Sequence, residues 1–128
     1  METKIALIGT GGTIAGKGTS NTDLTGYTAG VLGLDEILAS VPGTKPYGPY
    51  TYTQFSNIES SDITVNHWLE LSKLVQKLVN REDIGGVVIT HGTDSMEETA
   101  YFLNLTVHTD KPIVITGSMR PACLLYTS

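Results

Sequence analysis

Cysteine, basic residues and long apolar runs are all scarce in this sequence of 128 residues. Its single cysteine, Cys123, excludes an internal disulfide framework and a cysteine-based zinc site. With 8 basic and 13 acidic residues the net charge is −5, and no basic cluster is present to bind nucleic-acid phosphates. No run approaches the roughly 18 apolar residues that a membrane span requires. We therefore expect one globular domain that binds no nucleic acid and does not cross a membrane.

The first residues do not have the pattern of a signal peptide. Residues 1–4 lead directly into the short apolar run Ile5–Ile8, and glycines follow that run at once. We therefore expect a cytoplasmic protein. The alternative is a periplasmic or secreted mature form that begins at a methionine.

Short apolar runs alternate with amphipathic helical patterns along the chain. Strands covered on both faces are predicted where apolar residues are continuous, at 5–8, 87–89 and 113–115. The segment 50–55 is rich in tyrosine and threonine and predicts another strand. Apolar residues recur at helical spacing over 31–41, 65–79 and 95–105. This alternation predicts an α/β fold with a mostly parallel sheet and helices on both faces.

Capping residues indicate where two of these helices begin. Either Thr64 or Asp62 is suited to cap the helix over 65–79. The motif Ser95-Met-Glu-Glu98 has the spacing of a capping box and predicts the start of the last helix. Residues 9–27 lack helical periodicity and predict a loop or a loose hairpin.

A cluster of small and hydroxyl-bearing residues follows each of three predicted strands. The clusters are Thr10–Thr13, Thr90–Asp94 and Thr116–Ser118. Because parallel strands bring their carboxyl ends to the same edge of a sheet, we expect the clusters to converge on one crevice. Open α/β sheets bind their ligands at such a crevice, so this convergence is the main functional signal in the sequence.

A phosphate-binding loop is one interpretation of the first cluster. The dinucleotide fingerprint requires glycine at position 14, where isoleucine stands. The segment Gly11–Lys17 matches the beginning of a Walker A loop, but Gly18 replaces the Ser or Thr that would hold magnesium. No helical pattern follows to direct its amides at a phosphate. Magnesium-dependent nucleotide binding that is lost on changing Lys17 would favour this alternative.

Acyl transfer is the other chemistry that these clusters can support. The Thr13 hydroxyl becomes a nucleophile when a base or a cationic neighbour helps to remove its proton. Asp94 can hold a substrate ammonium group or orient Thr93, and backbone amides at the start of the next helix can bind an oxyanion. Purely structural roles compete with these: the threonines can bond to loop backbone, and Asp94 or Ser95 can cap the helix.

Three motifs in combination resemble one enzyme family. They are Thr10-Gly-Gly-Thr-Ile-Ala-Gly16, His91-Gly-Thr-Asp-Ser-Met-Glu-Glu-Thr-Ala-Tyr-Phe102 and Gly117-Ser-Met-Arg-Pro121. The resemblance is to the bacterial-type L-asparaginases, which include the glutaminase-asparaginases, and it runs from about Lys4 to Pro121. Such enzymes hydrolyse the side-chain amide of L-asparagine to aspartate and ammonia through an acyl-enzyme. The resemblance implies no metal and no other cofactor.

The resemblance implies four catalytic residues. Thr13 matches the nucleophile of the family. Tyr27 matches the tyrosine of a loop that closes over the substrate and helps to activate that threonine. Thr93 matches the second catalytic threonine, and Asp94 matches the aspartate that holds the α-ammonium group of the substrate.

The resemblance also implies which residues bind the substrate. Ser60 matches the serine that binds the α-carboxylate, and Ser61 beside it stands where many members carry glutamine. The amides of Gly12 and Thr93 match the oxyanion donors, and Ser118 lies where the family contacts the leaving amide. No metal site is expected, because metal-ligand spacing is lacking among His67, His91 and His108.

Family members continue well beyond residue 121. Their further sequence supplies the lysine of a Thr-Asp-Lys arrangement, a second, smaller domain, and an interface through which a neighbouring subunit completes the site in a homotetramer or dimer of dimers. We interpret residues 1–121 as the N-terminal, incomplete part of the asparaginase α/β domain, and residues 122–128 as a non-native or truncated tail. We expect this chain alone to be inactive and to aggregate through an unpaired apolar sheet edge.

The resemblance thus implies an L-asparaginase, an amidohydrolase acting on linear amides, with L-asparagine as the small-molecule substrate and L-glutamine as a further candidate. A non-catalytic amino-acid-binding module would use the same ammonium and carboxylate contacts. An amidotransferase-linked amidase would act on a larger amidated substrate. Replacing Thr13 with alanine separates a binder from an enzyme, because a binder keeps its affinity.

Overall fold

Four parallel strands form one sheet in the computed structural model, which describes residues 2–16, 33–41 and 43–121. The strand order is β2-β1-β3-β4, and all three neighbouring pairs are parallel. The strands are β1 (Lys4–Gly11), β2 (Tyr50–Ile58), β3 (Ile84–Thr90) and β4 (Ile113–Thr116). Each predicted strand is therefore present, and the sheet is parallel as the sequence predicts.

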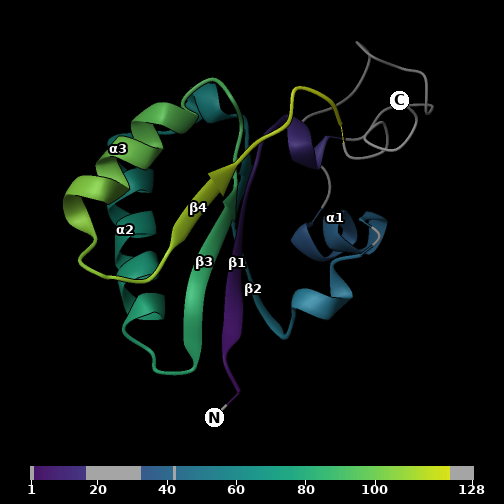
Figure 1. Cartoon of the computed structure of the whole chain (residues 1–128). Helices are drawn as coiled ribbons and strands as arrows, with labels where there is room; N and C mark the ends of the chain where they lie inside the picture. Colours follow the sequence, from purple (N-terminus) through teal and green to yellow (C-terminus); the bar gives the residue numbers. More distant parts are fainter. Residues whose placement is uncertain (1, 17–32, 42, 122–128) are drawn as a thin grey trace.

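Helices cover both faces of this sheet. The helices α2 (Val65–Val79) and α3 (Met96–Thr106) lie on one face, and the shorter α1 (Leu34–Ser40) lies on the other (Figure 1). The buried residues Leu34 and Ile37 belong to α1, which contacts β1 and β2. In the described part of the chain, no helix is both long and apolar enough to cross a membrane. The predicted α/β architecture is confirmed.

The strand β1 extends three residues beyond its apolar run. Gly9 still pairs with Gln54 on β2 and with Thr90 on β3, and after a register shift Gly11 pairs with Ile58. Gly9 is thus paired on both sides, whereas Gly11 is paired with β2 and has a positive φ angle of 109°. The predicted loop therefore begins later, and its remainder from residue 17 onward lies outside the described residues.

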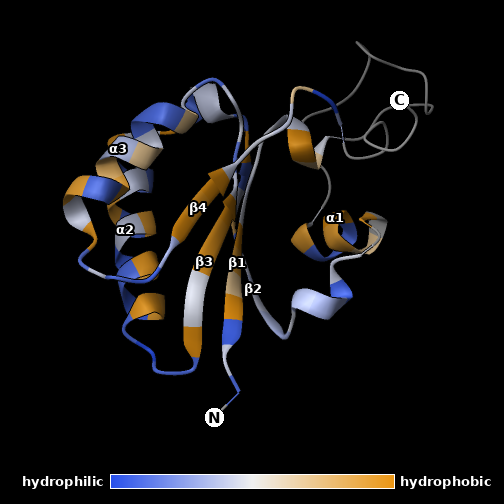
Figure 2. Ribbon diagram, viewed as in Figure 1, coloured by the Kyte–Doolittle hydropathy of each residue, from blue (hydrophilic) through white to orange (hydrophobic). Residues whose placement is uncertain are grey.

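The main core lies between the sheet and the helices α2 and α3. Alternate residues of the inner strands meet one face of α2, and Figure 2 shows the apolar residues gathered along the central strands. The buried members are Ala6, Ile8, Leu71, Val75, Leu78, Val79, Ile84, Val87, Ile89, Leu103 and Val107. Each square ångström of apolar surface buried here contributes about 25 cal/mol to the free energy of folding. This core holds the strands and helices together and thereby positions the loops at the strand ends.

The helix α2 begins with a reciprocal cap. Thr64 Oγ1 accepts a hydrogen bond from the His67 amide at 3.4 Å, and the Thr64 amide donates to His67 Nδ1 at 3.0 Å. Of the two predicted caps, Thr64 is thus the correct one, since Asp62 lies in the preceding 3₁₀ turn, Ser60–Asp62. His67 consequently has a structural role at the helix start.

Replacing Thr64 with alanine is expected to lower the free energy of unfolding by about 1 kcal/mol, because one helix amide loses its acceptor. Thr64→Ser keeps the oxygen and should stay within a few tenths of a kcal/mol of the parent. Denaturant unfolding followed by circular dichroism measures both changes. Equal losses for the two variants would show that the hydroxyl does not act as a cap.

The capping box predicted at Ser95–Glu98 is wrong. Ser95 stands at the N-cap position of α3, but its side chain makes no capping bond. Its Oγ donates instead to the Ser60 carbonyl at 2.6 Å, across 35 residues of sequence. The Ser95 hydroxyl thus bonds to an acceptor that is distant in sequence, although the local sequence predicts a bond to the start of α3. The bond joins the start of α3 to the loop after β2.

The last strand, β4, is less buried than its apolar run predicts. Val114 is 50% exposed, while Ile113 and Ile115 are only partly buried. The cause is topological: β4 lies at the end of the strand order and pairs only with β3 among the described residues. The apolar sheet edge expected from the sequence is therefore present in this part of the chain.

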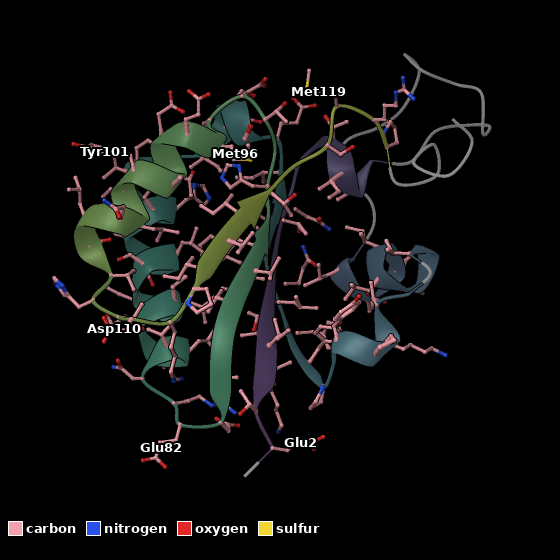
Figure 3. All side chains as sticks on the ribbon, in the orientation of Figure 1. Glu2, Glu82, Met96, Tyr101, Asp110 and Met119 are labelled. Carbon is pink, nitrogen blue, oxygen red and sulfur yellow. The ribbon has the colours of Figure 1, made fainter. Side chains whose placement is uncertain are left out.

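The carboxyl ends of the four strands share one edge of the sheet. Figure 3 places Met96, the first residue of α3, and Met119, which follows β4, at this edge. Glu2 and Glu82, which precede β1 and β3, lie at the opposite edge (Figure 3). The loops that leave the strands at the first edge therefore lie near one another.

Candidate active site

A pocket of about 320 Å³ opens among the loops that follow the strands. Its lining consists of Gly12, Thr13, Glu59, Ser60, Gly92, Thr93, Asp94 and Met119. The predicted site residues among them are Gly12, Thr13, Ser60, Thr93 and Asp94, and they follow three different strands. The clusters after β1 and β3 thus converge, as the parallel sheet predicts. No residue of the third cluster, Thr116–Ser118, is part of the lining, but Met119, which follows it directly, is.

Two glycines turn the chain at the end of β1. Gly11 and Gly12 have φ angles of 109° and 78°, which residues with side chains rarely adopt. A Cβ atom at Gly11 would lie 2.5 Å from the Ile58 carbonyl oxygen, so the ends of β1 and β2 are packed backbone to backbone. The next residue, Thr13, begins a 3₁₀ turn and faces the pocket.

Gly92 is the residue at which three loops meet. A Cβ atom on Gly12 would lie only 2.5 Å from the Gly92 nitrogen. A Cβ atom on Gly92 itself would lie 2.6 Å from Ser60 Oγ. Real Cβ atoms do not approach other heavy atoms so closely, so glycine is required at both positions. The loops after β1 and β3 can therefore touch through their backbones, and the Ser60 side chain of the loop after β2 packs against Gly92.

Ser60 joins the loop after β2 to the start of α3. It is buried, and its Oγ accepts hydrogen bonds from the amides of Asp94 at 2.9 Å and Ser95 at 3.3 Å. These two amides are therefore occupied, although the sequence suggests that they could bind an oxyanion. Because Ser60 Oγ already accepts twice, its hydroxyl hydrogen is the part that can donate to an anionic ligand.

The two amides expected to bind an oxyanion differ in the structure. The Gly12 amide donates to the Ile58 carbonyl at 3.0 Å, so this amide is not free to bind a ligand. Within the described residues, the Thr93 amide donates to no acceptor, and Thr93 lines the pocket. The Thr93 amide is therefore the donor that can stabilise negative charge developing beside Thr13.

Asp94 and Glu59 give the pocket a negative charge. Both residues are exposed, and neither forms an ion pair with any described residue. The lining that the structure describes includes no lysine, arginine or histidine. Two uncompensated carboxylates favour a ligand that carries an ammonium group.

Three predicted site residues lie away from this pocket or beyond the described chain. Ser61 and Ser118 are not part of the lining. The Ser118 hydroxyl donates to the Arg120 carbonyl at 2.7 Å and accepts from the Arg120 amide at 3.1 Å. Tyr27 lies outside the described residues. So do Lys17 and the tail 122–128, which contains Cys123.

Thr10, in contrast to Thr13, points its hydroxyl into the protein. It is 2% exposed, and its Oγ1 donates to the Thr90 carbonyl at 2.8 Å. Thr10 therefore has the structural role of bonding to backbone that the sequence left open for these threonines. Of the two threonines in the first cluster, Thr13 is the one that lines the pocket.

Three residues of the lining have no role predicted from the sequence: Glu59, Gly92 and Met119. Gly92 lies within the second cluster, Thr90–Asp94. Glu59 follows β2, and the rule that loops after parallel strands converge would have found it had that rule been applied to this strand. Met119 belongs to the motif after β4, and nothing in its residue type indicates a site.

The histidines have structural surroundings. His91 is fully buried, and its ring hydrogen-bonds Thr99 Oγ1 at 2.8 Å and the Gly92 carbonyl at 2.7 Å. Burial lowers the pKa of His91, and its hydrogen bond to Gly92 opposes this shift only in part. His108 is exposed. No group of three or more potential metal ligands occurs among the described residues.

Comparisons with known proteins agree in one family. The family model "Asparaginase, N-terminal" matches residues 4–127. The chain is 48% identical over 118 residues to L-asparaginase 2 of Bacillus subtilis (strain 168), covering 92% of this chain and 32% of the relative. It is 50% identical over 117 residues to a glutaminase-asparaginase of Pseudomonas aeruginosa, covering 91% of this chain and 32% of the relative.

A solved structure resembles the fold described above. The crystal structure of a probable cytoplasmic L-asparaginase from Campylobacter jejuni superposes with a TM-score of 0.89 at 49% identity, covering 95% of this chain and 37% of that one. The chain thus spans about a third of the length of the relatives it matches. The family model, the relatives and the shared fold agree with the motifs at the pocket, and the chain belongs to the asparaginase family.

Proposed function

We propose that the full-length protein containing this chain hydrolyses the side-chain amide of L-asparagine to aspartate and ammonia through an acyl-enzyme on Thr13. The observation that carries the proposal is that Thr13, Thr93 and Asp94 line one pocket although they follow different strands. Relatives named L-asparaginase and glutaminase-asparaginase support it. The chemistry requires no cofactor.

Recognition of the substrate uses its two charged groups. The exposed Asp94 carboxylate has no ion-pair partner among the described residues and would bind the α-ammonium group through a charge-assisted hydrogen bond. The Ser60 hydroxyl hydrogen would donate to the α-carboxylate, since its oxygen already accepts two amides. Contacts at both groups fix the amino acid, so that its side-chain amide extends toward Thr13.

The first chemical step forms an ester. Thr13 Oγ attacks the amide carbon while its proton passes, through a base, to the amide nitrogen. The family resemblance assigns help in this activation to Tyr27. The Thr93 amide would stabilise the oxyanion of the tetrahedral intermediate. The C–N bond then breaks, ammonia leaves, and the β-carboxyl group of aspartate remains bound to Thr13.

The second step releases aspartate. Water attacks the ester carbonyl, and the Thr93 amide again faces the developing negative charge. The C–O bond to Thr13 breaks, and Thr13 Oγ regains a proton. One amide bond and one water molecule are consumed for each aspartate and ammonia formed.

The 128-residue chain alone is proposed to be inactive. It spans about a third of the length of its relatives, and the resemblance places a lysine, a second domain and a partner subunit in the rest. The roles that the resemblance implies for Ser61, Ser118 and Tyr27 are likewise proposed for the full-length protein, in which their contacts with the substrate would form. The oligomer expected there is a homotetramer or a dimer of dimers.

The proposal predicts ammonia release by the full-length protein from L-asparagine. Coupling to glutamate dehydrogenase measures the ammonia, with L-glutamine as a second substrate and the 128-residue chain in a parallel reaction. Equimolar aspartate and ammonia from the full-length protein, with none from the short chain, is the expected result. Tight asparagine binding without turnover by the full-length protein would favour a binding module and contradict the proposal.

A further inference from the structure

A series of hydrogen bonds runs from the partly buried Trp68 to the edge of the pocket. Trp68 Nε1–H donates to Thr99 Oγ1 at 2.8 Å, and Thr99 Oγ1 lies 2.8 Å from His91 Nε2. On the other side of the ring, His91 Nδ1 lies 2.7 Å from the Gly92 carbonyl oxygen. His91 and Thr99 are both fully buried, so the two contacts of the His91 ring form without competition from water.

The acceptor at the end of this series fixes the direction of every bond. A carbonyl oxygen can only accept, so Nδ1 of His91 must carry a hydrogen. Burial lowers the pKa of His91 and keeps the ring neutral at pH 7, so Nε2 is an acceptor. The Thr99 hydroxyl therefore donates to Nε2 and accepts from Trp68. This is the one arrangement of hydrogens in which Trp68 Nε1, Thr99 Oγ1 and both ring nitrogens of His91 all have partners.

The His91 backbone is tied to the neighbouring strand as well. The His91 amide donates to the Thr116 carbonyl at 2.9 Å. A Cβ atom on Gly117 would lie 2.8 Å from the His91 carbonyl oxygen, so the loop after β4 packs directly on this peptide. The ring thus projects from a fixed backbone, and the group that it can position is the next carbonyl, that of Gly92.

We propose that His91 is a positioning residue for the reaction: its Nδ1–H group holds the Gly92 carbonyl and thereby fixes the turn that carries Thr93 and Asp94. Gly92 is also the residue on which Gly12 and Ser60 pack, so its peptide sets the spacing of the three loops. A rotation of this peptide would move the Thr93 amide relative to Thr13. The inference rests on the proposed function.

Two substitutions at His91 distinguish positioning from simple filling of the core. The amide nitrogen of His91→Asn can occupy a place near Nδ1 and still donate to Gly92. The longer His91→Gln reaches toward the Nε2 position and leaves the Gly92 carbonyl without its donor. Both replace a buried ring with an amide, so their effects on stability should be similar, and melting temperatures provide the matched control.

The first measurement compares steady-state kinetics in the full-length protein. His91→Gln is expected to lose about thirtyfold or more in kcat, because small displacements of reacting groups are costly, while His91→Asn recovers most of that loss. Equal activity per folded molecule in the two variants would overturn the inference. So would a larger loss in His91→Asn than in His91→Gln.

The second measurement does not depend on activity. Nitrogen-15 NMR of histidine-labelled full-length protein should show the Nδ1–H tautomer of a neutral His91 at pH 7. The amide signals of Thr93 and Asp94 should shift more in His91→Gln than in His91→Asn. An Nε2–H tautomer, or equal shifts in both variants, would overturn the inference. Absence of ammonia release by the parent protein would instead refute the proposed function, and the NMR result would still decide the role of His91.

Discussion

Replacement of Thr13 with alanine is expected to reduce the kcat of asparagine hydrolysis in the full-length protein by about a thousandfold or more. The substitution removes the only atom proposed to bond to the amide carbon and leaves the contacts of Asp94 and Ser60 with the substrate intact. Affinity for L-asparagine should therefore change little. Ammonia release and isothermal titration calorimetry measure the two quantities on the same sample.

The matched control lies three residues earlier. Thr10 is of the same type and lies at the end of β1, but its buried hydroxyl donates to the Thr90 carbonyl and does not line the pocket. Thr10→Ser keeps that donor and should preserve turnover, and Thr13→Ser should retain a measurable part of it because a nucleophilic oxygen remains. Turnover by Thr13→Ala near the parent rate would remove Thr13 from the mechanism.

Replacement of Asp94 with asparagine is expected to raise the KM for L-asparagine by about a hundredfold. A charge-assisted hydrogen bond contributes about 1.5–3 kcal/mol, and its loss leaves Glu59 as the remaining carboxylate of the described lining. The shape of the side chain is nearly kept, so kcat should fall much less than kcat/KM. Steady-state kinetics over a wide range of asparagine concentrations separates the two parameters.

Asp62→Asn provides the charge-matched comparison. Asp62 is exposed on the 3₁₀ turn after β2, and it does not line the pocket. Loss of this carboxylate makes the net charge of the molecule less negative by the same amount as Asp94→Asn, yet it should leave KM unchanged. A similar rise in KM for both variants would mean that the overall charge governs substrate binding and that Asp94 makes no specific contact.

The strands and helices could be predicted because their hydrophobic patterns agree with their places in the fold. Continuous apolar residues in β1 and β3 reflect burial on two faces, and the stripe along α2 reflects packing on one. The same pattern overstates the burial of β4. An apolar run indicates what a strand can bury, whereas the exposure of Val114 depends on which strand stands beside it.

The convergence of the site could also be predicted, because it follows from parallel strands alone. The hydrogen-bond partners could not. Ser95 has the local sequence of a cap, yet its hydroxyl donates to Ser60, which is distant in sequence. The Gly12 amide is likewise taken by Ile58, a partner that only the pairing of β1 with β2 reveals. Competition between local and tertiary acceptors is decided by packing, which residue patterns do not record.

The negative charge of the pocket has a second source that motif matching overlooks. Glu59 lines the pocket beside Ser60 and carries a carboxylate in addition to that of Asp94. A carboxylate near the group proposed to bind the substrate α-carboxylate opposes that contact electrostatically. Resemblance identifies residues that match a motif, so a charge contributed by a residue outside the motifs becomes visible once the lining is known.

Mass spectrometry of the acid-quenched protein tests the central claim most directly. During turnover of L-asparagine by the full-length protein, we expect an aspartyl ester on the peptide that contains Thr13, located by fragmentation to that residue and absent from Thr13→Ala. An ester on another residue, or continued ammonia release by Thr13→Ala with an unmodified peptide, would contradict the account.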